Sequence, residues 1–444
     1  MNPTSRRVFL RNGIVLGASV TSLSALLAAC GGSDSSGALD VAATPELEGE
    51  TIKVLVNQPN LGAWKVVAAE FEKETGAKVE LSPIPYDKLT SQAIRDVQSG
   101  AGEFDVFQYW YVGLGDLVEG GALEDLTDYI EEHADEIKPD DYLASIYDPY
   151  TLMDGRRWGL PFDGDTFLLF YNRRIFDEFG VQPPQTWDEY AQVAKTITEG
   201  GKGDVYGAIV MGQQVPIILG CSYADRLVGF GGRFVDESGK PQLTSPEAIA
   251  AAEALFAVGP DALPTPLQTG FDQAIPAFLN GQGAMIEFWT DMSVMASNPE
   301  QSKIIDDWAA VKLPVGGSNT VHGTALNAGF GAGVSAISKR KEAAAALVKF
   351  QSSPAVQEKI IGEFGTGGDP IRKSTLQSAA FKKTFGQAAP DVAEGLEGQP
   401  LVWPNTAGAV DKLQTLVDEL ALGIQGQQSA QEALEKAQAA WERA

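Results

Sequence analysis

From residue 51 onward, the chain alternates between two hydrophobic patterns. Short apolar runs predict strands at 51–57, 77–84 and 103–109, and helical spacing of apolar residues predicts helices at 63–76 and 86–100. Strands and helices that alternate in this way form right-handed β–α–β units, so we expect a parallel sheet covered on both faces. Ligands bind beyond the carboxyl ends of the strands in such sheets. The segments 57–64 and 108–113, which follow the first and third strands, are therefore candidate parts of a binding site.

The alternation restarts after residue 165. Apolar runs predict strands at 166–172, 205–211 and 281–289, and amphipathic spacing predicts helices at 186–198 and 245–259. Capping boxes are expected at Thr186 with Glu189, at Ser245, and at Ser429 with Glu432, where the last helix begins. The chain crosses back near 308–316, continues in a Gly-rich strand at 327–338 and is then mostly helical. This order predicts two α/β lobes joined by several crossings.

The first thirty residues differ from the rest. Arg6 and Arg7 precede a short apolar stretch rich in Ala and Ser, which is typical of an export signal and too short to span a membrane comfortably. The paired Arg resemble a twin-arginine signal, and the "LAAC" that ends at Cys30 resembles a bacterial lipobox. We therefore predict a signal peptide at 1–30, lipidation of Cys30 and a flexible tether at 31–50. An anchor that is never cleaved is the alternative.

Composition narrows the function. The chain has 444 residues and a net charge of −26, so it offers no basic surface to nucleic acid. Such a charge keeps a protein soluble and favours a monomer. The only other cysteine, Cys221, leaves no internal disulfide once Cys30 is lipidated, and its setting is typical of a small buried residue.

The stretch 159–176, "GLPFDGDTFLLFYNRRIF", places Asp163 and Asp165 before an apolar run. On one strand, residues i and i+2 share a face and lie about 6.6 Å apart. Two carboxylates at that spacing accept several hydrogen bonds from the vicinal hydroxyls of a sugar. The alternative is a simple turn, in which Asp163 bonds its own backbone and Gly164 adopts a positive φ.

Catalytic and metal sites find less support. The same spacing falls within the range of inverting glycosidases, but two acids on one face of a strand do not oppose each other across a bond. His133 and His322 lie far apart without the spacing of a zinc site, and no phosphate-binding or nucleophile motif is present. We expect no enzyme activity, no metal and no cofactor.

Aromatic and amide side chains supply the remaining candidates. Sugar rings stack on flat aromatic side chains while their hydroxyl groups bond polar groups. Polar and aromatic residues that follow predicted strands or precede a helix are Gln58, Asn60, Tyr109, Trp110, Trp289, Asp291 and Trp403. Tyr223 and Arg226 are weaker candidates. Each of these residues alone is more often part of a core than of a binding site.

Four segments together carry a family resemblance: 104–130, 154–198, 277–292 and 330–360. They resemble the family 1 extracellular solute-binding proteins, the maltose-binding-like receptors of ABC importers. The resemblance implies a type II periplasmic-binding-protein fold, with two α/β lobes joined by a hinge of several crossings. We place lobe 1 at 51–162 plus 313–372 and lobe 2 at 163–312 plus 373–444. It also implies that the residues after Leu160 and Pro161, and the candidate aromatic segments, line the cleft between the lobes.

By this resemblance the chain is an extracytoplasmic receptor that closes around an oligosaccharide or polyol and delivers it to the permease subunits of an ABC importer. We expect it to be exported and held at the cell membrane by the lipid on Cys30. The loop at 57–60 lacks the acid–base pair of the maltose-binding pattern, so the ligand need not be a maltodextrin. A polyamine or glycerophosphodiester receptor, or a surface glycoside hydrolase, are the alternatives.

Overall fold

The computed structural model describes residues 47–363 and 368–443. The predicted signal peptide and the lipobox with Cys30 lie outside these residues, as does most of the predicted tether. Within the described ranges, no helix has both the length and the hydrophobicity needed to cross a bilayer.

The first sheet has five strands in the order β2–β1–β3–β11–β6. They are β1 (Thr51–Asn57), β2 (Lys78–Ile84), β3 (Val106–Trp110), β6 (Leu160–Asp163) and β11 (Phe330–Val334). β1 lies parallel to both β2 and β3, as their β-branched runs and intervening helices predict. β11 runs antiparallel to β3 and to β6.

The second sheet has four strands in the order β10–β7–β9–β8. They are β7 (Phe167–Asn172), β8 (Tyr206–Ile209), β9 (Gly283–Trp289) and β10 (Trp308–Val311). Only β8 and β9 are parallel, and β7 is antiparallel to both of its neighbours. The expected parallel sheets are therefore wrong in part. β7 and β11 each follow a strand of the other sheet without a crossover helix between them. Each therefore runs antiparallel to its neighbours in the sheet that it joins. A short ribbon of β4 (Leu152–Met153) and β5 (Arg156–Arg157) completes the strands.

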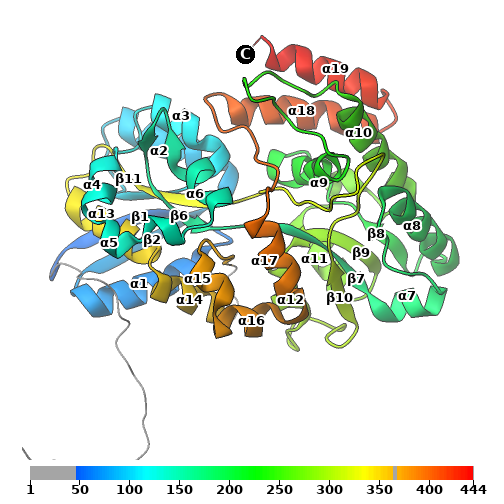
Figure 1. Ribbon diagram of the computed structural model, residues 1–444, viewed down its shortest axis with the longest axis horizontal. Helices are drawn as coiled ribbons and strands as arrows, with labels where there is room; N and C mark the ends of the chain where they lie inside the picture. Colours follow the sequence, from blue (N-terminus) through cyan, green and yellow to red (C-terminus); the bar gives the residue numbers. More distant parts are fainter. Residues whose placement is uncertain (1–46, 364–367, 444) are drawn as a thin grey trace, which may run out of the picture. The chain divides into compact units, whose positions relative to one another are not determined.

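Helices flank both sheets (Figure 1). Those that follow the strands of the first sheet are α1 (Leu61–Thr75), α2 (Tyr86–Gln98), α3 (Leu114–Glu119), α4 (Thr127–Glu132), α5 (Ala134–Ile137), α6 (Ala144–Thr151), α13 (Lys341–Gln351) and α14 (Pro354–Gly362). The second sheet is associated with α7 (Arg173–Phe179), α8 (Trp187–Gly201), α9 (Cys221–Gly229), α10 (Pro246–Val258), α11 (Phe271–Leu279), α12 (Met292–Ala296), α18 (Ala409–Ile424) and α19 (Ala430–Trp441). α15 (Lys373–Gln377), α16 (Ala379–Phe385) and α17 (Ala389–Glu397) lie along the return from the first sheet to the second.

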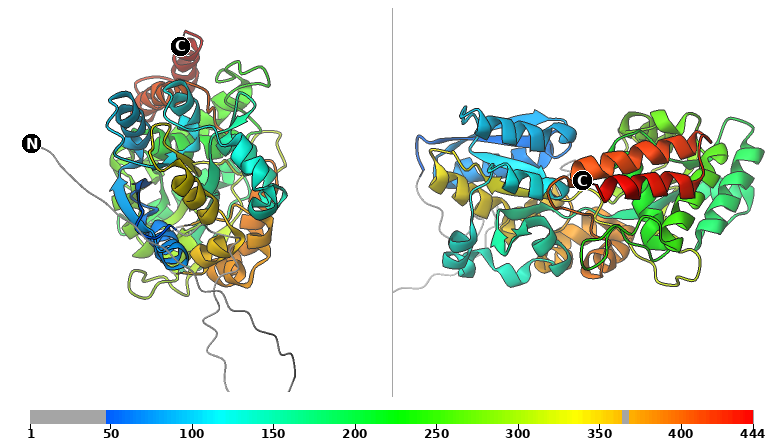
Figure 2. Two further views of the ribbon diagram at one scale, coloured as in Figure 1. Left: turned by 90° about the vertical axis from the view of Figure 1, so that its left-hand side faces the viewer. Right: turned by 90° about the horizontal axis from the view of Figure 1, so that it is seen from above.

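Local signals fix several helix ends. The capping boxes at Thr186 with Glu189 and at Ser429 with Glu432 are both confirmed. Ser245 caps α10 by accepting a hydrogen bond from the Ala248 amide, but alanine has no side chain to return the bond, so the box predicted there is incomplete. At the C-terminus of the chain, α18 and α19 lie side by side (Figure 2) and pack against α10.

Three chain segments connect the two sheets, and they are bonded to one another. Residues 164–166 lead from β6 to β7, residues 312–329 return from β10 to β11, and residues 398–408 precede α18. The Phe167 amide and the Thr166 hydroxyl both bond the Thr324 hydroxyl. The Leu401 amide donates to Thr324 O at 2.8 Å, and the Leu326 amide donates to Leu401 O at 3.0 Å. This bonded group of crossings lies where the family resemblance places a hinge, and we call it the hinge below; the lobe boundaries given above stay a prediction.

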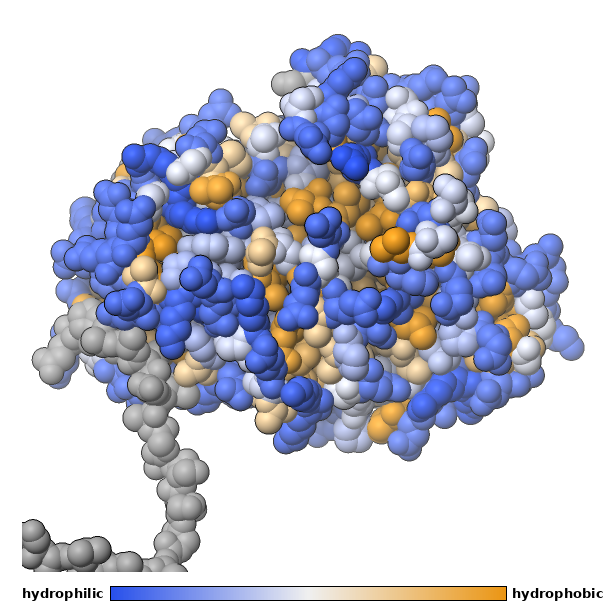
Figure 3. All heavy atoms as spheres, in the orientation of Figure 1, coloured by the Kyte–Doolittle hydropathy of each residue, from blue (hydrophilic) through white to orange (hydrophobic). Residues whose placement is uncertain are grey.

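Burial follows the predicted pattern. β9 is buried along its whole length, and β1 is buried at Ile52 and from Val54 onward. Cys221 is 1% exposed, in keeping with a small core residue. The face shown in Figure 3 is mostly hydrophilic, and hydrophobic side chains gather along its middle.

Candidate functional site

A cavity of about 350 Å³ lies between residues of the two sheets. It is lined by Asn57, Pro59, Asn60, Tyr86, Asp163, Asp165, Ile217, Phe271, Asp272, Ile275, Phe288, Trp289, Asp291, Met295, Ala328 and Phe330. Asn57, Asp163 and Trp289 are the last residues of β1, β6 and β9, so much of the wall stands at strand ends. The cavity therefore lies where the fold class predicts a ligand.

A second cavity, of about 370 Å³, lies at the crossings beside α17. Its wall includes Lys312, His322 and Glu394, and Lys312 is already paired with Glu394 at 2.5 Å. Buried carboxyl groups and aromatic rings gather only in the first of these two cavities. We therefore place the candidate site in the first.

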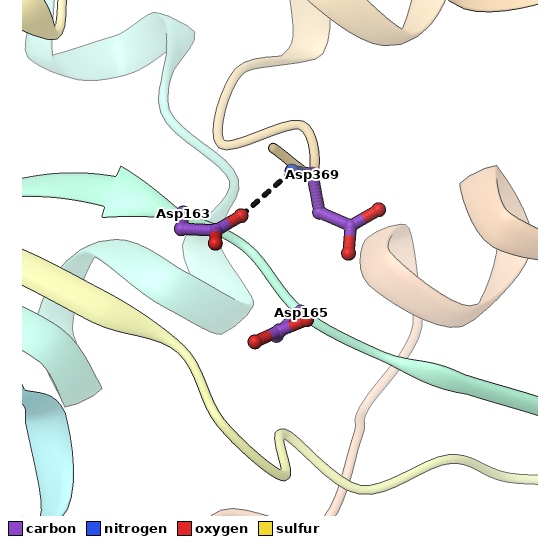
Figure 4. A group of neighbouring side chains, drawn as sticks. All are labelled: Asp163, Asp165 and Asp369. Atoms are coloured by element: carbon purple, nitrogen blue, oxygen red, sulfur yellow. Dashed lines mark hydrogen bonds between the residues drawn. The ribbon is translucent and has the colours of Figure 1, made fainter. Parts of the chain in front are cut away.

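Three aspartates converge beside this cavity. Asp163, Asp165 and Asp369 are 1%, 7% and 2% exposed, and each offers an oxygen within 4.8 Å of those of the other two. Figure 4 shows them on the chain segments that meet at the hinge, with the Asp369 amide donating to Asp163 Oδ1 at 2.6 Å. The Thr290 hydroxyl, just past β9, donates to the Asp369 carboxylate. Asp369 thus ties the end of the first sheet to the end of the second.

The backbone at 163–165 differs from the expectation. β6 ends at Asp163, and Asp165 adopts a left-handed conformation with φ 49° instead of continuing the strand. The two carboxyl groups are therefore not i and i+2 neighbours on one strand face, and that geometric argument is wrong. The turn reading placed the positive φ at Gly164, which is also wrong. Gly164 is instead needed for space, because a Cβ there would lie 2.2 Å from Pro370 O.

A polar network fixes the first of these carboxyl groups. Asn57 Nδ2 and Gln108 Nε2 both donate to Asn60 Oδ1 at 2.9 Å. These two bonds fix the orientation of the Asn60 amide, whose Nδ2 donates to Asp163 Oδ2 at 2.7 Å. Both oxygens of Asp163 are therefore occupied by donors, and its orientation is set before any ligand arrives.

Aromatic rings also line the cavity. Trp289 is 5% exposed and packs against Phe167, Phe271 and Phe288, with ring centroids 4.4, 5.2 and 5.3 Å away. Its indole Nε1 has no hydrogen-bond partner in the described part of the chain. A rigid ring held by three others is a suitable surface for an apolar ligand face.

Burial disfavours the charged form of these aspartates. It raises the pKa of Asp163 and of Asp165 well above the usual value, and the neighbouring carboxylates, Asp369 for the former and Asp163 for the latter, add to both shifts. Burial, with the charge of Asp369, raises the pKa of Asp291 to about 7. Burial also raises the pKa of Asp369 to about 6, although the Thr290 hydroxyl opposes the shift. The cluster therefore holds protons near neutral pH when it has no partner.

The structure brings five predicted residues together: Asn60, Asp163, Asp165, Trp289 and Asp291 all line the cavity. The other four do not line it. Gln58 is exposed on the loop after β1. Tyr109 is 1% exposed and its hydroxyl donates to Tyr150 O, whereas Trp110 and Trp403 pack against each other with ring centroids 5.8 Å apart. The weaker candidates Tyr223 and Arg226 are also buried away from the cavity.

Comparisons with known proteins establish the family. A family model described as bacterial extracellular solute-binding protein matches residues 57–358. The chain belongs to this family. A probable amino-acid ABC transporter periplasmic-binding protein from Sinorhizobium fredii is 26% identical over 373 residues, which cover 82% of this chain and 81% of the relative. A mannitol-binding protein from Pseudomonas aeruginosa is 25% identical over 387 residues, 79% of this chain and 82% of the relative.

Solved structures share the fold of this solute-binding protein. An ABC transporter solute-binding protein from Agrobacterium radiobacter in complex with ribitol matches with a TM-score of 0.79, 24% identity and coverage of 89% of this chain and 99% of the other. One from Agrobacterium vitis with bound D-mannitol has a TM-score of 0.73 and 20% identity, and covers 89% and 98%. The predicted two-lobed α/β fold and the family resemblance are confirmed. The family's role is to capture a solute outside the cytoplasm and present it for transport.

Sequence reasoning missed several residues that form the site. Asp369 was passed over because the segment 365–370, "GTGGDP", has the composition of a plain loop. Tyr86 and Phe288 lie within a predicted helix and a predicted strand, and Phe271 was assigned to no predicted element, so none of the three was named as a candidate. The one available signal was the position of Asp369 directly before Pro370, near the predicted boundary at which the chain passes from lobe 1 to lobe 2.

Proposed function

We propose that this solute-binding protein captures a carbohydrate or polyol between its two lobes and delivers it to the permease of an ABC importer. The observation that carries the proposal is the composition of the cavity wall, which combines buried carboxyl groups with a rigid aromatic surface. Hydroxyl groups donate to the carboxylates, and the apolar face of the ligand covers Trp289. A volume of about 350 Å³ lies at the lower end of ligand pockets, which favours a small sugar or polyol over a long oligosaccharide.

The relatives support this choice of ligand class. One is named for mannitol, and two structures of the same fold hold ribitol and D-mannitol. Another relative is named as a probable amino-acid transporter component. A carboxylate or phosphate on the ligand would meet several acids and no cation here, because no Lys, Arg or His is among the described residues that line the cavity. Amino acids and glycerophosphodiesters are disfavoured for this reason.

The hinge supports a closing mechanism. Asp163 and Asn60 belong to the first sheet's side of the cavity, and Trp289 and Asp291 to the second. A ligand that touches both groups stabilises the closed arrangement by its differential affinity for that state. The permease then recognises the closed form.

A thermal-shift screen across polyols, monosaccharides, oligosaccharides, amino acids and glycerophosphodiesters tests the proposal. We expect stabilisation by one or more polyols or small sugars, in proportion to ligand concentration over the dissociation constant. Trp289→Ala should then weaken binding of that ligand by at least about 1 kcal/mol in calorimetry. Trp158→Ala is the matched control, because Trp158 is half-buried beside the β4–β5 ribbon and does not line the cavity. Stabilisation by amino acids alone would contradict the proposal.

We also propose that the mature chain is a monomer held at the membrane by a lipid on Cys30, the last residue of the "LAAC" motif. Several acyl chains give stable anchoring where one chain does not. In a host with the lipoprotein pathway, the protein should fractionate with membranes, and Cys30→Ala should release it into the soluble fraction. Recovery of both forms in the same fraction would argue against the anchor.

A further inference from the structure

The carboxyl groups of the cavity have no built-in counter-ion. Asp163, Asp165, Asp272 and Asp291 line the wall, and Asp369 stands directly behind it. Among the ion pairs of residues 47–363 and 368–443, none includes any of these five aspartates. Asp163, Asp165 and Asp369 are buried, whereas Asp272 is exposed. Burying a charge without a partner is costly, so the three buried carboxyl groups must be neutralised by protons or by something that binds.

Asp165 and Asp369 offer carboxyl oxygens within 4.8 Å of each other, and burial, with the charge of Asp163, raises the pKa of Asp165 well above its usual value, so the pair holds a proton in the free protein. A hydrogen bond between two carboxyl groups requires one, because two carboxylates offer only acceptors. In the free protein a bound proton thus neutralises one carboxylate at the point where Asp163, Asp165 and Asp369 converge (Figure 4). A ligand with its own positive charge can take the place of that proton.

A second observation, independent of the acids, is that the side-chain oxygen of Asn57 lacks a hydrogen-bond donor within the described chain. Asn57 is 2% exposed and lines the cavity, and its Oδ1 accepts no hydrogen bond from the described residues. Its Nδ2 donates to Asn60 Oδ1, so exchanging the positions of Oδ1 and Nδ2 by a flip of the amide would break that hydrogen bond. An unsatisfied buried acceptor costs free energy until a ligand N–H or O–H reaches it.

The aromatic wall suits the same charge. The face of an indole ring attracts an ammonium group, and the attraction grows when water is excluded. Trp289 lines the same cavity as Asp163 and Asp165, with its ring fixed by Phe167, Phe271 and Phe288. Carboxylates, an amide oxygen and an aromatic face are together the groups that bind a protonated amine.

We propose that the transported solute carries a protonated amine, as an aminopolyol or amino sugar does, and that its ammonium group binds among Asp163, Asp165 and Asp369. This inference rests on the proposed function for the hydroxyl-bearing part of the ligand. The ammonium group supplies three N–H donors, and the proton shared by Asp165 and Asp369 leaves to solvent as it binds. One positive charge replaces another, and the charge of the site is unchanged.

A matched pair of ligands tests the amine directly. Calorimetry at pH 8 compares 1-amino-1-deoxy-D-glucitol with D-glucitol, which differ only in an ammonium group for a hydroxyl group. We expect the amine to bind at least about tenfold more tightly, the ratio typical of a charge-assisted hydrogen bond over a neutral one. Repeating the titration in buffers of different ionisation enthalpy should reveal release of a proton from the protein.

Affinity for the amine should fall as the pH is lowered from 8 to 5. An aliphatic amine, like a lysine with a pKa of about 10.4, stays protonated throughout, whereas the cluster regains its protons. The other titratable groups that line the cavity or lie near the cluster are Asp272 in α11, Asp291 before α12, Tyr86 in α2, Tyr150 in α6 and Cys221 in α9. None of them supplies a cation, and D-glucitol affinity should change less.

Asp165→Asn should reduce the preference for the amine to less than about threefold, because an amide keeps the shape but not the charge. Asp204→Asn, in an exposed turn before β8, is the matched control and should keep the preference. Equal affinity for the two ligands in the wild type would overturn this inference while leaving the proposed function intact. Binding of the amine and of putrescine, but of no uncharged sugar or polyol, would support the amine and refute the proposed ligand class.

Two further outcomes overturn the inference. Absence of any amine binding does so, whatever the uncharged ligands show. Stabilisation by Ca²⁺ or Mg²⁺ alone, with competition against the amine, would show instead that the three aspartates hold a metal ion.

Discussion

Two groups of buried acids in this protein have opposite surroundings. In the second lobe, Glu287 of β9 is 3% exposed and accepts a hydrogen bond from Arg226 Nη1 at 2.7 Å. The Arg226 guanidinium is itself fully buried, bonded to Ser222 O and stacked 4.3 Å from the Trp187 ring. At the hinge, Asp163, Asp165 and Asp369 are as deeply buried, with no cation beside them in the described chain.

The difference separates structure from binding. Where a buried acid belongs to the core, as Glu287 does, the sequence supplies its counter-ion, and the charge of the acid is neutralised within the folded protein. Where the acids border a cavity, the counter-ion is left out, and the site remains incomplete until a ligand arrives. Asp225 is an intermediate case. Burial raises its pKa well above the usual value, while the Asn327 amide donates to it at 2.8 Å.

The largest effect is expected when the core pair is broken. Arg226→Met leaves Glu287 buried without a cation and should lower the free energy of unfolding by about 3–5 kcal/mol. The double variant Arg226→Met with Glu287→Met should recover most of this loss, because two apolar side chains replace the whole pair. Urea denaturation followed by circular dichroism measures both. A single variant that loses less than about 1 kcal/mol would show that the pair is not a structural counterpart of the cluster.

Much of the fold followed from local pattern. The strand predicted at 51–57 has those bounds in β1, and α8 begins at the residue after its predicted cap, Thr186. These features depend on hydrophobic period and capping, which act over a few residues. The direction of β11 did not follow, because it is decided by how the chain returns from the other lobe.

The site was predictable only in part, for the same reason. Tyr109 and Trp110 were expected at the end of the third strand, but β3 continues through Trp110 and β11 pairs alongside both, with Gly331 opposite Tyr109 and Phe330 opposite Trp110. A partner strand more than two hundred residues away thus turned predicted wall residues into core. Asp369 was missed in the opposite way. It joins Asp163 across 206 residues of sequence, a contact that no local pattern could signal.

A smaller effect is expected in how the free energy of unfolding depends on pH, and it sharpens the comparison between the two groups of acids. A carboxyl group whose pKa is raised in the folded state binds protons that the unfolded chain has already released, so its contribution to stability is present at low pH and lost as pH rises. For Asp369 the window runs from its usual value near 3.8 to about 6. The loss is on the order of 1.4 kcal/mol per pH unit for each whole proton involved. Glu287 differs from Asp369 because its carboxylate is paired with the Arg226 guanidinium.

The variant Asp369→Asn isolates the contribution of the Asp369 charge to the pH dependence of stability. An asparagine side chain still accepts a hydrogen bond from the Thr290 hydroxyl, and the backbone amide still donates to Asp163, but the charge is removed. Without ligand, its stability relative to the wild type should increase between pH 4 and pH 6 and then level off, since the wild type alone gains the unfavourable charge. The surface variant Asp204→Asn should track the wild type across the same series. Urea unfolding at half-unit pH steps measures the three proteins. A constant difference between Asp369→Asn and wild type would mean that the cluster has a counter-ion even when no ligand is bound, and the contrast between the two groups of acids would disappear.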